Sequence, residues 1–238
     1  MFSACKIGLF ALSTLELSAS ALAHPPVKRS VPVLMGLAGP FGAIASTTLT
    51  STGDTLITGN CGTCPGTAVV GFPPGECTGI TSPAGTAACD AEAACLTAYN
   101  NAKGLVATQA LPSSDLGGLT LGPGVYTFPS SAATLSTILT LNGATNPTGQ
   151  FIFQIATTFA TSANASVILQ NGAQACNVYF QVGSSATILA ATKLQGNVLA
   201  YTSISVAEAA SNRGTLCALN GAVTLIDNAL TALTTCST

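Results

Sequence analysis

The pattern of apolar and polar residues changes every few positions along most of the chain. Short runs of β-branched and aromatic residues end at Gly, Pro, Asn or Ser, which is typical of short strands joined by tight corners. The runs predict strands at residues 67–71, 119–128, 136–141, 151–156, 166–170, 178–182, 187–190, 197–201 and 222–226. The chain is therefore predicted to be mainly β.

A helical pattern occurs once, at residues 87–106, in the stretch AACDAEAACLTAYNNAKGLV. Pro83 precedes this stretch and Gly104 lies near its end, as expected for helix boundaries. Helical spacing brings five small residues together on one face: Ala91, Ala94, Cys95, Ala98 and Ala102. The sequence thus predicts a single helix inserted into an otherwise β chain.

Imperfect repeats run through the predicted strands. FQIATTFAT begins at Phe153 and FQVGSSATILA begins at Phe180, and the corner sequences LNGA, QNGA and LNGA begin at residues 141, 170 and 219. Asn-Gly supplies the positive φ of a sharp corner. Loose repeats of short strands favour a β-solenoid, in which each coil stacks on its neighbour. A β-sandwich is the alternative, but the repeated units lack the clean inward and outward alternation of hairpins.

Length and composition are consistent with one domain that buries a core. The chain has 238 residues, is 48% hydrophobic and has a mean hydropathy of +0.56. The apolar residues after the N-terminal segment form short runs, not a stretch of about 20 residues that would span a bilayer. We expect the domain to cover residues 37–238.

The first 23 residues resemble a secretory signal peptide. Lys6 supplies the positive charge, residues 7–17 are largely apolar, and Ala21-Leu22-Ala23 fits the cleavage pattern. A membrane anchor is less favoured because the apolar run is short and interrupted by polar residues. We expect a secreted, extracellular protein in which residues 24–36 form a linker or a short pro-segment. Lys28-Arg29 offers a dibasic site for further processing.

Removal of Cys5 with the signal peptide leaves an even number of cysteines, which in an oxidising compartment favours disulfides. The eight are Cys61, Cys64, Cys77, Cys89, Cys95, Cys176, Cys217 and Cys236. The CxxC pair of Cys61 and Cys64 has no second ligand pair, so we expect structural bridges and no metal site.

The spacing of the cysteines suggests some pairings but does not fix the connectivity. Cys89 and Cys95 lie six residues apart, too far around a helix to face each other, so each is expected to reach a different partner among Cys61, Cys64 and Cys77. Cys176 and Cys217 occur in comparable contexts and are expected to bridge neighbouring coils.

Charge is nearly absent, and this excludes several classes of function. From Ser30 onward the chain holds three basic and seven acidic residues, a net charge of −4, and residues 116–192 hold none. Nucleic acids and anionic lipids need a basic field that this chain lacks, so no nucleic-acid or membrane partner is expected. No small-molecule substrate or cofactor is indicated either.

Catalytic arrangements are also poorly supported. The one histidine, His24, lies at the predicted mature terminus, where a free tail is the simpler interpretation. Asp115 and Asp227 could form a pair of carboxylates for hydrolysis, but both lie in sequences typical of turns. We therefore do not expect an enzyme.

Several motifs, in order along the chain, resemble the microbial ice-binding (antifreeze) protein family. They are LAGPFGAIAS, TSTGDTLITGNCGTCPGTAVVGFPPG, AACLTAYNNAKG, DLGGLTLGPGVYTF, GQFIFQIATT, NGAQACNVYFQVGSSATI and NGAVTLIDNAL. The resemblance spans nearly the whole mature chain. It implies a right-handed β-helix of roughly triangular section, with one long α-helix packed alongside and a flat β-face that binds ice. This chain departs from the family pattern in its cysteines between residues 61 and 95 and in Glu208.

The family's ice-binding face carries motifs of the form Thr-Ala/Gly-x-Thr/Asn, which match residues 157–160, 184–187, 202–205 and 221–224 of this chain. The resemblance therefore implies a set of ice-binding residues: Thr157, Thr158, Ser184, Ser185, Thr187, Thr202, Ser203, Ser205 and Thr224. Neutral hydroxyl and methyl groups suit this task, because a charged group keeps its own hydration shell and would disrupt the match to an uncharged lattice. The implied partner is the surface of an ice crystal.

Two other functions remain open. A secreted adhesive or cell-surface protein could use the same neutral face to bind a polymer or another copy of itself. A polysaccharide-degrading enzyme on a β-helix would need Asp clustered with Arg or Lys in the middle coils, which the uncharged residues 116–192 do not supply. Asn164 begins an Asn-Ala-Ser sequon and is a candidate glycosylation site.

Overall fold

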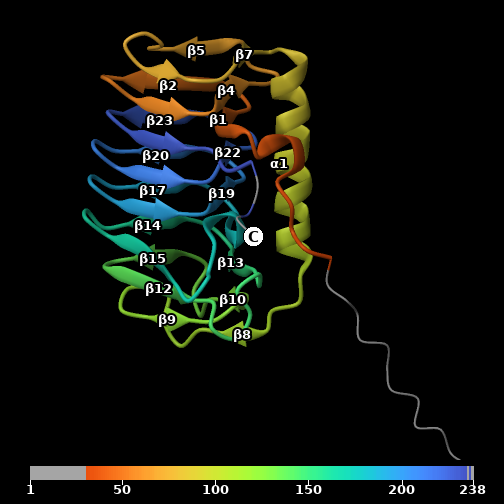
Figure 1. The fold of residues 1–238 in the computed structure, drawn as a ribbon, viewed down its shortest axis with the longest axis vertical. Coiled ribbons are helices and arrows are strands. Elements are labelled where there is room, and N and C mark those ends of the chain that lie inside the picture. Colours follow the sequence, from red (N-terminus) through yellow and green to blue (C-terminus); the bar gives the residue numbers. More distant parts are fainter. Residues whose placement is uncertain (1–30, 235, 237–238) are drawn as a thin grey trace, which may run out of the picture. The chain divides into compact units, whose positions relative to one another are not determined.

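A computed structural model describes residues 31–234 and residue 236, and these form a parallel β-helix with one long helix at its side (Figure 1). The predicted signal peptide at residues 1–23 lies outside the described residues, as do His24 and Lys28-Arg29. The predicted solenoid is confirmed, and the alternative β-sandwich is wrong because every pairing between strands is parallel.

Three parallel sheets wall the described β-helix, and the strands of each sheet follow in their spatial order. Sheet A contains β7 (Thr81–Pro83), β4 (Asn60–Thr63), β1 (Phe41–Ala45), β22 (Leu216–Ala218), β19 (Asn197–Ala200), β16 (Val178–Val182), β13 (Phe151–Ile155), β10 (Gly124–Thr127) and β8 (Gln109–Ala110). Sheet B contains β11 (Ala133–Leu135), β14 (Phe159–Thr161), β17 (Ala186–Ile188), β20 (Ile204–Val206), β23 (Val223–Ile226), β2 (Thr48–Thr52) and β5 (Ala68–Val70). Sheet C contains β6 (Glu76–Cys77), β3 (Leu56–Thr58), β24 (Ala229–Thr231), β21 (Ser211–Arg213), β18 (Lys193–Gln195), β15 (Ser166–Gln170), β12 (Ile138–Asn142) and β9 (Thr120–Leu121).

The coils do not stack in sequence order throughout. The coil formed by β13, β14 and β15 is followed by the coil of β16, β17 and β18, and so on to the coil of β22, β23 and β24. That last coil then pairs with the first, as Ala43 pairs with Leu216 and Leu49 with Val223. The N-terminal coils therefore stack on the C-terminal coil. The long helix then runs alongside the stack and carries the chain to its other end (Figure 1).

Aromatic side chains form the centre of the core. The rings of Tyr126, Phe153 and Phe180 occupy paired positions in sheet A and stack with centroids 5.4 and 5.0 Å apart. Phe159 from sheet B packs on Phe180 with the same 5.0 Å separation. The two FQ repeats thus place the same residue at the same position in successive coils, so that the repeat in sequence becomes a stack of rings in space.

The helix α1 (Thr86–Gly104) covers sheet A together with the short 3-10 helix η1 (Gly36–Ala38). The buried side chains of α1 are Ala88, Ala91, Cys95, Ala98, Tyr99 and Ala102, so the predicted small-residue face is confirmed apart from Ala94, which is half-buried. Small side chains on this face let the helix approach sheet A closely. A second 3-10 turn, η2 (Ala175–Asn177), precedes β16.

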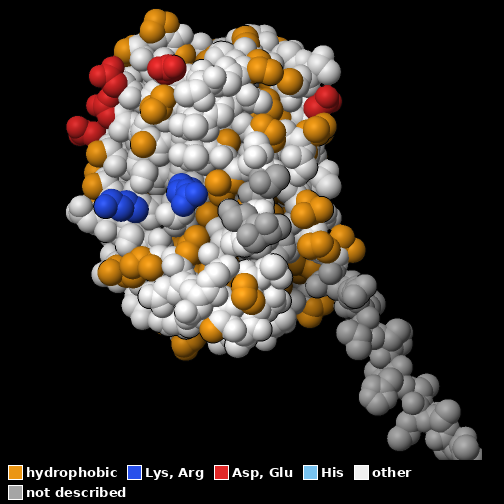
Figure 2. All heavy atoms as spheres, viewed as in Figure 1, with side chains coloured by type: hydrophobic (Ala, Val, Ile, Leu, Met, Phe, Trp, Pro, Cys, Tyr) orange, Lys and Arg blue, Asp and Glu red, His pale blue; other side chains and the backbone are white. Residues whose placement is uncertain are grey.

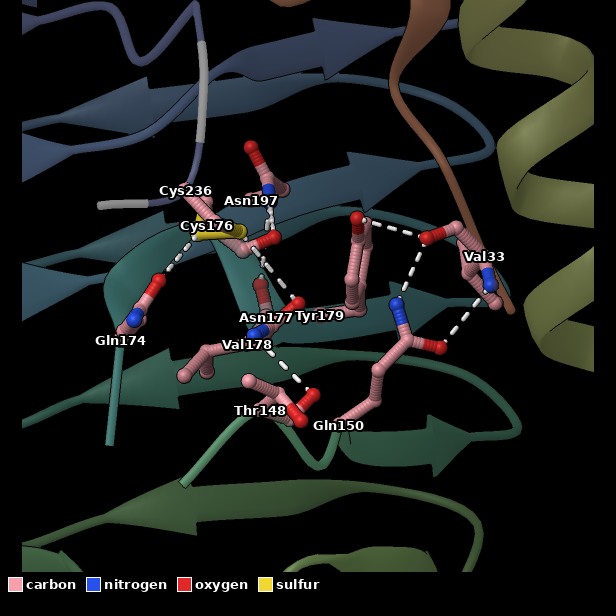
Figure 3. The surroundings of a disulfide bond; sticks show 10 residues. All are labelled: Val33, Thr148, Gln150, Gln174, Cys176, Asn177, Val178, Tyr179, Asn197 and Cys236. Carbon is pink, nitrogen blue, oxygen red and sulfur yellow. Dashed lines mark hydrogen bonds between the residues drawn. A yellow bond between two sulfur atoms is a disulfide. The ribbon is translucent and has the colours of Figure 1, made fainter. Parts of the chain in front are cut away.

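The segment before η1 is held by the side chains of Gln150, which precedes β13, and of Tyr179 in β16 (Figure 3). The amide of Gln150 accepts a hydrogen bond from Val33 N at 2.9 Å and donates one to Val33 O at 2.7 Å. The hydroxyl of Tyr179 donates to the same carbonyl at 2.9 Å. Val33 is fully buried, so residues 33–38 form a fixed strap along one flank of α1.

All eight cysteines that follow the predicted signal peptide form disulfides. The pairs are Cys61–Cys77, Cys64–Cys89, Cys95–Cys217 and Cys176–Cys236. The CxxC cysteines thus bridge to different partners and form no redox pair. The expected partner of Cys89 is confirmed, but those of Cys95, Cys176 and Cys217 are wrong, because the sequence does not show that α1 lies over β22 or that the C-terminus returns to η2.

We predict that the Cys95–Cys217 bridge contributes most to stability, since it joins α1 to β22 across 122 residues. Replacing both cysteines with Ala should lower the free energy of unfolding by about 2–5 kcal/mol. The matched control is the double Ala variant of Cys61 and Cys77, which lie 16 residues apart and should cost less. Denaturant unfolding of both variants measures this; an unchanged midpoint for the Cys95 and Cys217 variant would contradict it.

Glu92 of α1 makes the stability depend on pH. Both carboxylate oxygens are buried without a hydrogen-bond partner among the described residues, and burial raises the pKa of Glu92 from 4.5 to about 7. The folded state therefore holds this proton more tightly than the unfolded state does. The free energy of unfolding is therefore highest below pH 4.5, where Glu92 is protonated in both states. It falls by about 3 kcal/mol as the pH rises through 7.

Glu92→Gln should accordingly flatten the decline in unfolding free energy between pH 4.5 and about 7. Asp90→Asn is the control, because Asp90 is exposed on the same helix. Urea unfolding across this range measures the slope. If Glu92→Gln retains the slope of the unmodified protein, the burial of this carboxyl is not its cause.

Candidate functional site

The three sheets present different outer surfaces. Outward side chains of sheet A, such as Ile44, Ile152 and Leu199, are buried beneath α1 and the strap. Sheet C carries Lys193 on β18 and Arg213 on β21, which are neighbouring strands. In the described part of the chain, sheet B is neither covered by a helix nor charged at any outward strand position. Figure 2 shows two basic groups close together on the visible face and acidic groups gathered along its upper left edge.

In-register pairing places one outward residue from each strand of sheet B in a straight line across the sheet. We call this line the central file: Thr134, Ala160, Thr187, Ser205, Thr224, Thr50 and Val70. Neighbouring members lie about 4.8 Å apart, the spacing of paired strands. Five of the seven side chains bear a hydroxyl. The central file is therefore a regular, uncharged array of hydroxyl and methyl groups.

Three of the residues implied by the motifs belong to the central file. Thr187, Ser205 and Thr224 are exposed and pair with one another in adjacent strands. Their neighbours within each strand, such as Ile204 and Val206, point inward and are buried. The strands thus anchor these hydroxyls from below and hold them at fixed spacing.

A second group lies two residues earlier on the same side of the strands, at Thr158, Ser185 and Ser203. Thr158 is exposed, but Ser185 and Ser203 are half-buried. Ser203 Oγ accepts a hydrogen bond from Ala222 N at 3.3 Å, and Ser185 Oγ accepts one from Ser203 N at 3.5 Å. These two hydroxyls therefore help to join successive coils and are less available to a ligand than their motif suggests.

The remaining three residues, Thr157, Ser184 and Thr202, lie at the corner between sheets A and B. Their backbones continue the stacking, since Ser184 N donates to Thr157 O at 2.7 Å and Thr202 N donates to Ser184 O at 2.9 Å. The structure thus brings all nine residues to sheet B or its leading corner.

Motif matching missed residues at both ends of the array. Thr48, Thr50 and Thr52 of β2 extend the outer side of sheet B, and Thr134 extends the central file at β11. The alternating threonines of the stretch TLTST carry a strand signal. No short-range pattern in the sequence indicates that this first coil lies beside the last one.

Acidic side chains flank sheet B without entering the file. Glu208 follows the end of β20 and lies in the turn toward sheet C, where Ala191 N donates to its carbonyl. Asp227 follows β23 with a φ of +46°, and its Oδ1 accepts a hydrogen bond from Asp54 N at 2.6 Å. The departure from the family pattern at Glu208 thus falls at the edge of the face.

The two carboxylates considered for catalysis do not meet. Asp115 bridges to Thr134 at one end of sheet B, whereas Asp227 follows β23, so they are about five strand spacings or about 24 Å apart. Burial acts to raise the pKa of Asp115, but hydrogen bonds from Ser136 and Gly117 outweigh it and lower the pKa. Both residues stabilise turns. Among the described residues, no three His, Cys, Asp or Glu side chains gather where they could hold a metal ion.

Sequence and structure comparisons identify the class of protein. Residues 43–231 match the Ice-binding-like family. An ice-binding protein of Nostoc sp. (strain HG1) is 42% identical over 196 residues, which cover 82% of this chain and 72% of that protein. Described helices also include none long and apolar enough to cross a membrane.

Solved structures agree. The crystal structure of the ice-binding protein from the Antarctic ascomycete Antarctomyces psychrotrophicus matches with a TM-score of 0.80 at 39% identity, covering 86% of this chain and all of that one. An ice-binding protein from an Antarctic biological consortium matches with a TM-score of 0.81 at 38% identity, covering 84% of this chain and 91% of that chain. The chain therefore belongs to the ice-binding-like family.

Proposed function

We propose that this protein is secreted and adsorbs to ice through the outer face of sheet B, and that it thereby inhibits ice growth or recrystallisation. The observation that carries the proposal is the central file, a straight array of small uncharged side chains on the one sheet that the described residues leave both open and uncharged. The named relatives, which are ice-binding proteins, support the choice of ligand.

The physical argument rests on regularity. A solid surface is met by many weak contacts at once, so the contacts add up only if the side chains hold a fixed spacing and a common height. In-register parallel strands hold both, because each outward residue is anchored between two buried ones. Hydroxyl and methyl groups order water without the tight hydration shell of a charge.

Export is supported by two independent features. The N-terminal sequence fits a signal peptide, and four disulfides join the described residues, as is usual in oxidising compartments. Asn164 is exposed in the turn after β14 with a φ of +62°. In a eukaryotic host we propose it as a glycosylation site, which would place a glycan at the corner of sheets B and C.

The test uses single bulky substitutions. Thr187→Tyr or Ser205→Tyr should lift neighbouring side chains off a flat solid and abolish most thermal hysteresis. Both sites are exposed, so the free energy of unfolding should change by no more than about 0.5 kcal/mol. The matched control is Thr58→Tyr, at an exposed outward position of sheet C.

Thermal hysteresis and circular dichroism of the three variants decide the assignment. Loss of hysteresis in the sheet B variants alone supports sheet B as the ice-binding face. Full hysteresis in folded Thr187→Tyr and Ser205→Tyr proteins would show that the face is wrong. If the unmodified protein has no effect on ice growth at high concentration, the adhesive function becomes the better interpretation.

A further inference from the structure

A cavity of about 420 Å³ lies between the C-terminal half of α1 and the corner that joins sheets A and B. Its lining residues come from the helix, from sheet A and from the corner: Tyr99, Lys103, Thr127, Gln154, Ala156, Gln181, Gly183 and Tyr201. This volume falls within the usual range of ligand sites in proteins. None of these residues belongs to the proposed ice-binding set on sheet B.

A second cavity of about 330 Å³ also borders Tyr201 and continues toward the start of the helix. Together the two cavities follow Glu92, Leu96, Tyr99 and Lys103, which are spaced so that they lie on one side of α1. The helix rises about 17 Å from Glu92 to Lys103, so the cavities form an elongated furrow.

The other flank of α1 shows what such a furrow accommodates. There the strap fills the space, with Val33, Met35 and Ala38 buried against the helix. Within the described residues, no segment of the chain occupies the furrow on the side of Tyr201. The helix therefore has one flank packed by the strap and one flank open.

The glutamines of the two FQ repeats have different roles in this furrow. Gln154 donates from Nε2 to Ala102 O at 2.8 Å and to Leu105 O at 2.9 Å, and so caps the C-terminus of α1. Gln181 pairs with Gln154 one strand further along and faces the same cavity. Its side-chain amide has no hydrogen-bond partner among the described residues.

Tyr201 borders both cavities, and Tyr99 lies beside it in the wall of the 420 Å³ cavity. The rings of Tyr99 and Tyr201 are 5.9 Å apart at an angle of 39°, and Tyr201 is 47% exposed. Lys103 Nζ lies 5.9 Å from the centre of the Tyr99 ring. Exposed aromatic carbon is thus combined with amide and hydroxyl groups, with Lys103 toward one end of the furrow and Glu92 toward the other.

We infer that this furrow binds a neutral oligosaccharide. The ring of Tyr201 would pack on the apolar face of a sugar ring, while the amide of Gln181 and the hydroxyls of Tyr99 and Thr127 would bond its hydroxyl groups. A peptide would lack a strand edge to pair with, because the corner backbones are already bonded between coils. The elongated shape suits several linked sugar rings better than one.

The test uses isothermal titration calorimetry, which detects binding equally in variants that lack Tyr201. Neutral hexasaccharides of β-1,4-glucose, β-1,3-glucose, α-1,4-glucose and N-acetylglucosamine are titrated into the disulfide-bonded protein. At least one should give a saturable signal. Tyr201→Ala and Gln181→Ala should each weaken its binding at least tenfold, and Thr187→Tyr should leave it unchanged.

This test is independent of ice binding, so its failure would not bear on the sheet B face. Circular dichroism checks that each variant folds. Tyr201 is partly exposed and Gln181 is buried, so Tyr201→Ala still tests the site if Gln181→Ala does not fold. Absence of a saturable signal with all four hexasaccharides would overturn the inference. Binding that survives Tyr201→Ala, or binding of an extended peptide in place of the sugars, would overturn it too.

Discussion

In-register stacking of parallel coils is the constraint on which the other features of this protein depend. Because each strand pairs with its equivalent in the next coil, a residue type that recurs along the sequence becomes a column in space. Inside the β-helix the column is aromatic, with Phe153 stacked on Phe180. On the outside of sheet B, the corresponding column is the central file. The same backbone ladder thus produces both the core and the surface.

The three sheets are equivalent in backbone but not in surroundings, and this difference assigns their roles. Sheet A is buried by α1, whose alanines permit a close approach that larger residues would prevent. Sheet C accepts charges and faces water. Sheet B is left with a neutral outer surface. A neutral surface in water would usually be a liability, but hydroxyls keep it hydrated, and among the described strands of sheet B only β11 and β5 have a free edge, which limits aggregation.

Much of this architecture was predictable from the sequence, and the reasons are local. The strand patterns, the Asn-Gly corners and the alanine-rich helix each depend on neighbouring residues, so the solenoid and its single helix could be expected. The motif matches also selected residues that lie on the outer side of sheet B or at its leading corner. The disulfide partners of Cys95 and Cys176 could not be predicted, since they depend on where α1 and the C-terminus lie. The contribution of Thr50 depends on its pairing with Thr224 in the last coil, and no short-range pattern records that pairing.

The central claim is that sheet B adsorbs to ice, and partition of the protein into a slowly growing ice crystal tests it most directly. The unmodified protein and its Thr187→Tyr variant, each fluorescently labelled, are mixed with a non-binding protein of similar size, and all are measured in the ice and in the remaining liquid. The account predicts that the unmodified protein becomes enriched in the ice while the variant and the non-binding protein are excluded. Exclusion of all three to the same extent, or equal enrichment of the variant, would contradict the account.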